Sequence, residues 1–367
     1  MKFTGNRERL LEAFNVVGSV VSPRAIKPIL QNLRMVVGPE GALLLATDLE
    51  VALRYRVPLD VVEEGGDVVI PVGRVQGILR ESTADRIVFT SDDRNVQIVA
   101  GNGRFRIQGE DPEEFPVIPA FEDQKALAIP REAFRAMVRK THFAAARERS
   151  RFAFNGVRLQ VDGDEVRMIA TDGKRMAVKM TPVDNPEKIA AGHIIPTKGL
   201  LTFEKVVTDD DPVVRVSVDD RQVMIKTQRA EVSSRLVEGA FPRYETVIPK
   251  ETPLSASFPR ETLLRAMRQA KLLTNEESRS VRLSFDDGKM VISARAMDVG
   301  DARVELETTV EGTPVETAFN PDFMIEGLSA MDGDKVVLRI SGRDTPALLD
   351  GEKDYQYVVM PVTVRSA

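Results

Sequence analysis

Two stretches, residues 45–57 (LATDLEVALRYRV) and residues 169–180 (IATDGKRMAVKM), are two copies of one pattern and decide the fold of this chain. Each has an apolar run, a Thr-Asp pair and a second apolar run, which predicts a strand, a tight turn and another strand. The pairs Thr47-Asp48 and Thr171-Asp172 stand 124 residues apart. Residues 291–307 keep the strand–turn–strand pattern without the pair. Repetition at this distance indicates several similar domains.

The repeat extends along the whole chain. Arg34, Arg158 and Arg282 follow one another at the same spacing in similar segments, and VVIPVGRVQGIL near Pro71 resembles HIIPTKGLLTF near Pro196. Each copy reads helix, strands, helix, strands, which is typical of an α+β domain. Apolar residues at helical spacing predict opening helices within 10–17, 134–138 and 263–270 and second helices at 74–79, 198–206 and 323–331. The expected domains are 1–122, 123–251 and 252–367.

The composition restricts the kind of protein this is. The 367 residues carry a net charge of −5 and include no Cys, which excludes disulfides, thiolate nucleophiles and Cys-based zinc sites. The N-terminus, MKFTGNRERLLEAF, lacks the apolar core of a secretory leader, and no stretch approaches the roughly 20 apolar residues of a membrane span. We therefore expect a cytoplasmic protein without a membrane partner.

Basic and acidic residues are separated along the chain. The second copy carries Arg131, Arg135, Arg139 and Lys140 on its opening helix, and acidic residues gather in turns such as Asp209-Asp210-Asp211. Such a separation favours diffuse attraction to a phosphate backbone, although a solvated helix face is the alternative for any single helix. The absence of Trp and the four Tyr argue against binding of single strands by base stacking.

Sequence motifs for catalysis are lacking. The chain has two His, His142 and His193, in different parts of their copies, and it has neither a P-loop nor a dinucleotide-binding motif. The triplet at Asp209 favours a polar loop over a cation site, and the Thr-Asp pairs favour turns over catalytic carboxylates. We expect no cofactor, no metal and no enzymatic activity. Two hypotheses stay open at this point: a hydrolase that uses the Thr-Asp turns, and a protein that binds DNA without sequence preference and without encircling it.

Four segments in order, ATDLEVALRYRV, TDGKRMAV, EGAFPRYETVIP and YVVMPV, resemble the bacterial DNA sliding clamps, the β subunits of DNA polymerase III. The resemblance covers essentially the whole chain. It implies three clamp domains, each with two helices on an inner face and antiparallel sheets outside, in a head-to-tail ring of two subunits. Such a processivity factor encircles double-stranded DNA. It tethers the replicative DNA polymerase, the clamp loader and repair proteins through short peptides.

The resemblance also implies three groups of residues. The peptide groove would comprise Phe154, Thr171, Gly173, Lys174, Arg175, Met176, Pro242, Thr246, Val247, Asn320, Phe323, Val358, Val359, Met360, Pro361 and Val362. DNA would be met by Arg24, Arg74, Arg80, Arg147, Arg149, Arg151 and Lys198. The dimer interface would include Arg104, Phe105, Leu272, Leu273, Asp298 and Asp301. Lys174 stands where the family often has His, and Thr246 where it often has Arg. A buried edge strand is the alternative interpretation of VVMPV.

Overall fold

The computed structural model describes residues 1–22, 24–25, 27–92, 94–123, 125–146, 154–275, 279–286 and 288–362. Within these residues neighbouring strands pair antiparallel, so the expected α+β class with antiparallel sheets is confirmed. The α-helices are α1 (Arg7–Gly18), α2 (Val72–Glu81), α3 (Arg131–Thr141), α4 (Thr197–Val206), α5 (Arg260–Lys271) and α6 (Pro321–Ala330). Short 3-10 helices are η1 (Pro28–Gln31), η2 (Pro112–Glu114), η3 (His142–Ala144) and η4 (Tyr244–Thr246).

All six predicted helices are present, but the order of elements differs from the expectation at the start of each copy. A strand precedes the first helix in every copy, namely β1 (Lys2–Asn6), β10 (Leu127–Pro130) and β18 (Leu254–Pro259). The prediction that each copy opens with a helix was therefore wrong. These strands are four to six residues long, too short for a period-two pattern to stand out beside the longer helical pattern that follows.

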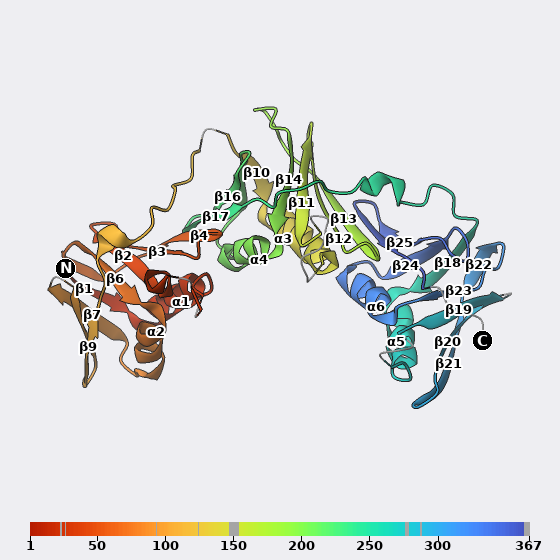
Figure 1. Cartoon of the computed structure of the whole chain (residues 1–367), viewed down its shortest axis with the longest axis horizontal. Coiled ribbons are helices and arrows are strands. Elements are labelled where there is room, and N and C mark those ends of the chain that lie inside the picture. Colours follow the sequence, from red (N-terminus) through yellow and green to blue (C-terminus); the bar gives the residue numbers. More distant parts are fainter. Residues whose placement is uncertain are drawn as a thin grey trace. The chain divides into compact units, whose positions relative to one another are not determined.

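The first compact unit contains residues 1–134, 183–189 and 198–236. Its five-stranded sheet has the order β5-β1-β7-β8-β9, with β5 (Val61–Glu64), β7 (Arg86–Asp92), β8 (Asn95–Ala100) and β9 (Gly103–Gln108). Its eight-stranded sheet has the order β10-β15-β16-β17-β4-β3-β2-β6, with β2 (Asn32–Gly38), β3 (Gly41–Thr47), β4 (Val51–Val57), β6 (Gly66–Pro71), β15 (Val213–Val218), β16 (Gln222–Lys226) and β17 (Ala230–Arg235). Helices α1 and α2 lie side by side, and α1 packs on β3 and β4 (Figure 1).

The second compact unit contains residues 135–182, 190–197 and those from 237 onward. Its nine-stranded sheet has the order β14-β11-β12-β13-β26-β25-β24-β18-β22, with β11 (Gly156–Asp162), β12 (Glu165–Thr171), β13 (Arg175–Pro182), β14 (Ala191–Pro196), β22 (Thr309–Gly312), β24 (Lys335–Ile340), β25 (Ala347–Glu352) and β26 (Tyr355–Val359). The four-stranded sheet has the order β21-β20-β19-β23, with β19 (Val281–Asp286), β20 (Lys289–Ala296), β21 (Gly300–Glu307) and β23 (Thr317–Phe319). Helices α5 and α6 pack on each other.

Alternation of buried and exposed residues produces the core of each copy. Helix α1 buries Leu10, Phe14 and Val17 on one face, and the rings of Phe3 and Phe89 stack at 4.8 Å between centroids. Full burial of side chains of this size contributes roughly 2 kcal/mol each to stability. The core of the first copy therefore lies between α1 and α2 and the strands on which these helices pack.

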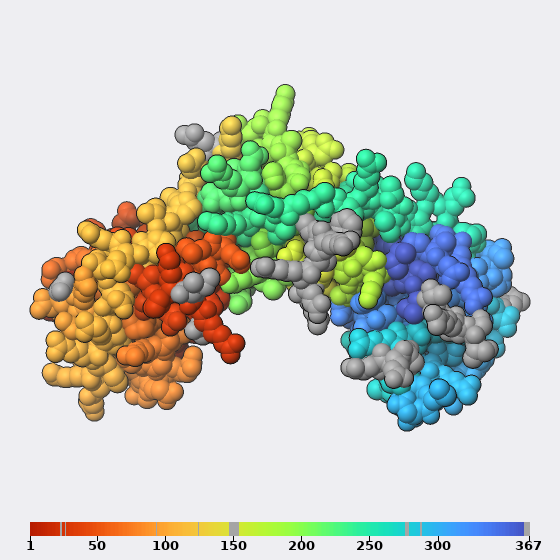
Figure 2. Space-filling view, viewed as in Figure 1, coloured from red at the N-terminus to blue at the C-terminus, as the bar shows by residue number. Residues whose placement is uncertain are grey.

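The middle copy divides its strands between the two large sheets. Strand β17 pairs with β4 of the first copy, and β13 pairs with β26 of the third (Figure 1). In the space-filling view, the blue surface of the third copy lies directly against the yellow-green surface of the second (Figure 2). In the repeat, β9 of the first copy is equivalent to β17 and β26, and β21 of the third copy is equivalent to β4 and β13. Both β9 and β21 lie at the edge of their sheets.

Candidate functional site

The two Thr-Asp pairs build the same turn. Thr171 Oγ1 donates a hydrogen bond to the Arg175 carbonyl at 2.7 Å, and Asp172 Oδ1 accepts from the backbone N–H groups of Lys174 and Arg175 at 2.9 and 3.0 Å. Thr47 and Asp48 make the corresponding bonds in the first copy. Both carboxylates are thus occupied by backbone donors, which is the role that turn chemistry predicts.

Arg175, directly after the second turn, is buried and lies in a polar network. It bonds Asp172 Oδ2 at 3.1 Å and the Phe143 carbonyl at 2.7 Å, it forms an ion pair with Glu326, and its guanidinium lies 4.6 Å from the centre of the Phe323 ring. Five donors in a fixed plane allow one side chain to hold all these groups. Arg175 therefore ties β13 of the second copy to α6 of the third.

The ionisation of this network follows from its burial. Burial by itself would lower the pKa of Arg175, but Tyr357, Glu326 and Asp172 outweigh it and raise the pKa above the ordinary value. Burial raises the pKa of Tyr357 as well, and its hydroxyl donates to the Phe323 carbonyl at 2.8 Å. The arginine is charged and the phenol neutral at any physiological pH.

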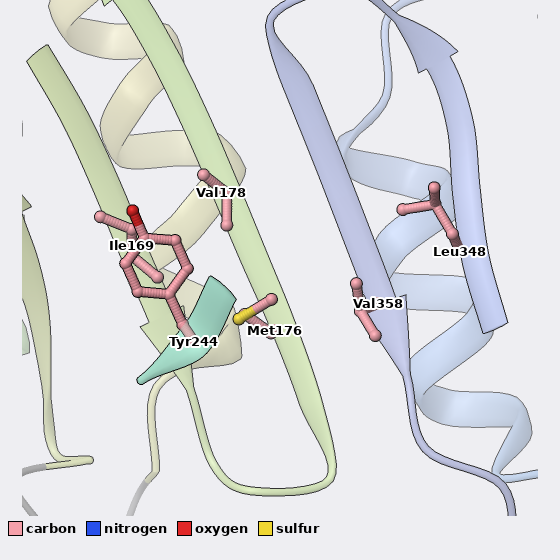
Figure 3. Packing of buried hydrophobic residues seen from close by; sticks show 6 residues of the cluster. All are labelled: Ile169, Met176, Val178, Tyr244, Leu348 and Val358. Carbon is pink, nitrogen blue, oxygen red and sulfur yellow. The ribbon is translucent and has the colours of Figure 1, made fainter. Parts of the chain in front are cut away.

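An apolar pocket of about 90 Å³ opens beside the second turn. Strands β12 and β13 supply one wall, β26 another, and the segment through η4 a third. Its lining residues are Phe154, Thr171, Gly173, Arg175, Met176, Pro242, Tyr244, Val247, Val358 and Met360. Figure 3 shows Met176 and Val178 of β13 facing Tyr244, with Val358 across on β26. Nine of the expected groove residues are thereby brought together, and Tyr244 joins them.

A larger hollow of about 930 Å³ adjoins the pocket, since Arg175 and Met360 line both. Five more expected groove residues lie here, namely Lys174, Asn320, Phe323, Pro361 and Val362. Sequence reasoning missed the other members, Ala145, Ala146, Asp172, Arg279, Asp322 and Glu326. Glu326 lies three residues after the expected Phe323 on the same helix, and this helical spacing is the signal that could have pointed to it; Asp322 directly precedes Phe323.

Two expected groove residues line neither hollow. Val359 is buried next to Val358 on β26, and alternation along a strand places its side chain on the opposite face. Thr246 is exposed at the end of η4, where its hydroxyl donates to the Arg243 carbonyl at 2.7 Å. The alternative interpretation of VVMPV as a buried edge strand is correct about burial, since Val358 and Val359 are both buried, but wrong about the edge, because β26 pairs with β13 on one side and β25 on the other. Val358 and Met360 line the pocket.

The expected DNA-binding residues have different environments. Arg24, Arg74 and Arg80 are exposed, and Lys198 is exposed but paired with Asp48. Arg147, Arg149 and Arg151 lie outside the described residues. Not all basic residues of α3 are available to DNA. Lys140 is only 2% exposed and forms ion pairs with Asp332, at 2.9 Å, and with Glu352, so it stabilises the fold. Burial had no signature in the sequence that would separate Lys140 from its exposed neighbours.

The residues expected at the dimer interface are on the surface. Phe105 on β9 is 41% exposed, Leu272 after α5 is 76% exposed, Leu273 is half-buried, and Arg104, Asp298 and Asp301 are exposed. Met297 and Val299 in the turn before β21 are exposed as well, and sequence reasoning missed them. Asn275 donates to Asp298 at 2.6 Å, which holds this turn beside the end of α5. The sequence signal that could have identified Met297 and Val299 is the presence of two large apolar residues in a predicted hairpin turn.

Other candidate sites are resolved by local contacts. Asp211 is buried and accepts hydrogen bonds from Thr208 and from the Gln228 backbone, so it stabilises its loop. Among the residues that the structure describes, no group of His, Cys, Asp or Glu has the arrangement of a metal site. In the same residues, no helix combines the length and apolar character needed to cross a membrane.

Comparison with known proteins gives the same family for all three copies. Residues 1–119, 128–243 and 245–363 match the family models of the N-terminal, central and C-terminal domains of the DNA polymerase III β subunit. The chain is 30% identical to the β sliding clamp of Pseudomonas putida, over 99% of this chain and 100% of that protein. The DNA polymerase sliding clamp of Bacillus subtilis is similar in structure, with a TM-score of 0.95 and 25% identity over 100% of both chains. A sliding clamp of Pseudomonas aeruginosa bound to griselimycin has a TM-score of 0.94 and 29% identity over 99% of this chain and 100% of that one.

Three repeated α+β domains with sheets continuous between copies define a DNA clamp. The chain belongs to the bacterial β sliding clamps, the β subunits of DNA polymerase III, and its function is that of a processivity factor in DNA replication. The expected family and function are confirmed.

Proposed function

We propose that two copies of this chain, each with clamp domains 1–122, 123–251 and 252–367, close head to tail into a ring around duplex DNA. The observation that carries the proposal is the pattern of sheet edges. The first and second copies join through β4 and β17, and the second and third through β13 and β26. The equivalent strands of the first and third copies, β9 and β21, are edge strands with one side unpaired in their sheets. A β9 strand of one subunit is therefore suited to pair with β21 of another.

The exposed apolar residues fit such a junction. Phe105 on β9 would enter a patch made by Leu272, Leu273, Met297 and Val299, an arrangement typical of the centre of an interface. Arg104, Asp298 and Asp301 are exposed, and Arg104 of one subunit would pair with Asp298 or Asp301 of the other at the rim. Because the two contact surfaces differ, the contact is heterologous and closes only at a fixed number of subunits, here two.

We propose that DNA is held by topology and by weak phosphate attraction, without catalysis. Exposed Arg24, Arg74, Arg80 and Lys198 would supply the positive charge, together with Arg147, Arg149 and Arg151. Strong contacts would slow sliding, whereas diffuse attraction permits movement along the duplex. We expect the protein to act at the chromosome, in the cytoplasm, as a subunit without an active site of its own.

The pocket and the hollow beside it would bind short peptides of the replicative polymerase, the clamp loader and repair proteins. Met176, Val247, Val358 and Met360 form an apolar surface that side chains of different shapes can fill, because Met adapts its conformation at little cost. Tethering through a peptide raises the effective concentration of the polymerase at the primer end, and this gives processivity. Lys174 lines the hollow at a position where the family often has His, so the charge of the groove would differ from that of many relatives.

The test compares retention of the loaded protein on closed circular DNA with retention after the circle is cut once. The ring predicts stable retention on the circle and release within minutes after linearisation, since sliding off an end requires no bond to break. Phe105→Asp should abolish retention on circles and yield monomers in native mass measurements, while Val117→Asp, at another exposed apolar position, should change neither. Equal retention on circular and linear DNA would instead identify a DNA-binding protein that forms no ring.

A further inference from the structure

The three arginines at equivalent positions do not have equivalent partners. Arg34 on β2 pairs with Asp67 at 3.0 Å through Nε, and Arg282 on β19 pairs with Glu316 at 2.6 Å. Both acids precede the second helix of their copy by the same distance along the sequence. At the corresponding position the middle copy has Gly192. Within the described residues, no carboxylate lies within ion-pair distance of Arg158.

The surroundings of Arg158 give part of its guanidinium no hydrogen-bond partner among the described residues. Its Nε is buried and has no acceptor among the residues that the structure describes. Its guanidinium lies 5.8 Å from the centre of the Phe241 ring, and a Cβ added to Gly192 would stand 3.2 Å from one terminal nitrogen. A buried donor without an acceptor costs free energy, so a carboxylate arriving here would be favoured.

Arg158 is also close to the apolar pocket. Phe241, which it contacts, is followed in the chain by Pro242, a pocket residue. Gln160, two residues along β11 on the same face, lies 3.4 Å from the hydroxyl of Tyr244, which also lines the pocket. Residues two apart on a strand are roughly 7 Å apart. About three extended residues of a bound peptide would cover the distance from the pocket to Arg158.

We propose that Arg158 is a specificity residue that binds a carboxylate side chain of the partner peptide whose apolar residues occupy the pocket. The inference rests on the proposed function of that pocket. Charge complementarity identifies the ligand group, because a guanidinium without an internal acid can donate two parallel hydrogen bonds to a planar carboxylate. The missing acid of the middle copy would thus be supplied by the partner.

The experiment measures binding of four fluorescein-labelled peptides to the full-length protein by fluorescence anisotropy. Each peptide has an apolar block of two leucines and a phenylalanine, a three-residue Gly-Ser spacer, and either Glu or Gln, placed before or after the block. For the unchanged protein we expect Glu to bind about tenfold tighter than Gln in one of the two orientations. The Gln peptides give the affinity of the pocket alone.

Two variants test the assignment in different ways. Arg158→Gln removes the charge, and Gly192→Asp supplies the internal acid that the other copies have, where the atom to be displaced is the end of a flexible side chain. Both should reduce the Glu-to-Gln ratio to about one and leave the Kd of the Gln peptides and retention on circular DNA unchanged. A ratio that survives in both variants, or that is absent from the unchanged protein in both orientations, overturns the proposal.

The other outcomes are equally decisive. If Arg158→Gln weakens retention on circular DNA and leaves the ratio intact, the arginine serves nucleic acid and the proposal is wrong. If none of the peptides binds, the proposed function of the pocket fails and this inference fails with it. Normal binding of the Gln peptides with an unchanged ratio overturns the inference alone.

Discussion

Phe115 in the first copy and Phe241 in the second occupy the same place in a Phe-Pro motif, but their surroundings differ. Phe115 is only 4% exposed and packs with Leu45, Ala52 and Ile118 over the outer face of β3 and β4. Phe241 is half-buried at the margin of the corresponding cluster and contacts Arg158. The first copy closes this face with its own side chains, whereas the second leaves room for the apolar pocket.

The residues on the adjoining strands account for the difference. Ala52 stands opposite Ser233 of β17, and Met176, at the equivalent position, stands opposite Val358 of β26. The second junction therefore presents a wider apolar wall. Arg34 pairs with Asp67, whereas the guanidinium of Arg158 lies 5.8 Å from the centre of the Phe241 ring, a distance that allows a cation–π interaction. Duplicated segments with the same turn thus acquire different functions through a few neighbours.

The largest expected effect distinguishes the two phenylalanines directly. Phe115→Ala should destabilise the first copy by about 3 to 4 kcal/mol, because it leaves a cavity in a closed cluster. Phe241→Ala should cost about 1 kcal/mol, since part of that ring is already in water. Urea unfolding followed by circular dichroism measures both. Equal losses would show that the two faces are packed alike and would remove the contrast.

Arg175→Met should lower stability by about 2 to 3 kcal/mol. The substitution keeps an apolar stem but leaves Asp172 and Glu326 without their cation at a buried position. The value lies at the lower end for buried pairs because Glu326 is partly exposed. Arg265→Met on the exposed face of α5 is the control, with no measurable change expected. A loss no greater than that of the control would mean that the network does not hold β13 to α6.

Val247→Asp should weaken binding of an apolar peptide about 30-fold, or about 2 kcal/mol, because a charge would be desolvated in the pocket. Val213→Asp is a matched control, since both valines are 37% exposed and Val213 lies on β15, away from the pocket. Fluorescence anisotropy with the Gln peptides measures the effect. Similar losses in both variants would indicate general damage and not a peptide site.

The smallest effect concerns pH. Burial would raise the pKa of Asp332, but Lys140 and Arg139 outweigh it and lower the pKa. A lowered pKa means that the stabilisation is complete above the unfolded value of about 4 and is lost as the pH falls through the folded value. Asp332→Asn should therefore cost about 0.5 kcal/mol at pH 7, a small value because the carboxylate is half exposed.

The measurement is the difference in unfolding midpoint between Asp332→Asn and the unchanged protein at pH 7 and pH 3. We expect the difference to shrink at pH 3, where the unchanged carboxylate begins to take up its proton. Asp350→Asn, which removes the carboxylate that pairs with Arg339 between β24 and β25, controls for the loss of a surface charge. A difference that is the same at both pH values would exclude ionisation of Asp332 as its cause.

The sequence by itself determined the threefold repeat, the six helices, the turns at Thr47-Asp48 and Thr171-Asp172, and the family. These features depend on local patterns, namely hydrophobic periodicity, turn residues, and short segments that resemble those of the family in the same order. The position of most of the apolar pocket followed from the same segments. The resemblance, and not periodicity, pointed to residues as distant as Met176 and Val358.

Only the tertiary structure decided which side chains those patterns leave exposed. Lys140 and Arg139 are neighbours on one helix, yet one is buried in an ion cluster and the other exposed, because strand β25 and the loop before β24 approach one side of α3. Val358 and Val359 are adjacent and face opposite sides of a sheet. Arg158 lacks the acid that its equivalents have, and this emerges only when the pairing of β11 with β14 places Gly192 beside it. Burial and charge pairing depend on contacts between residues far apart in the chain, which local patterns do not encode.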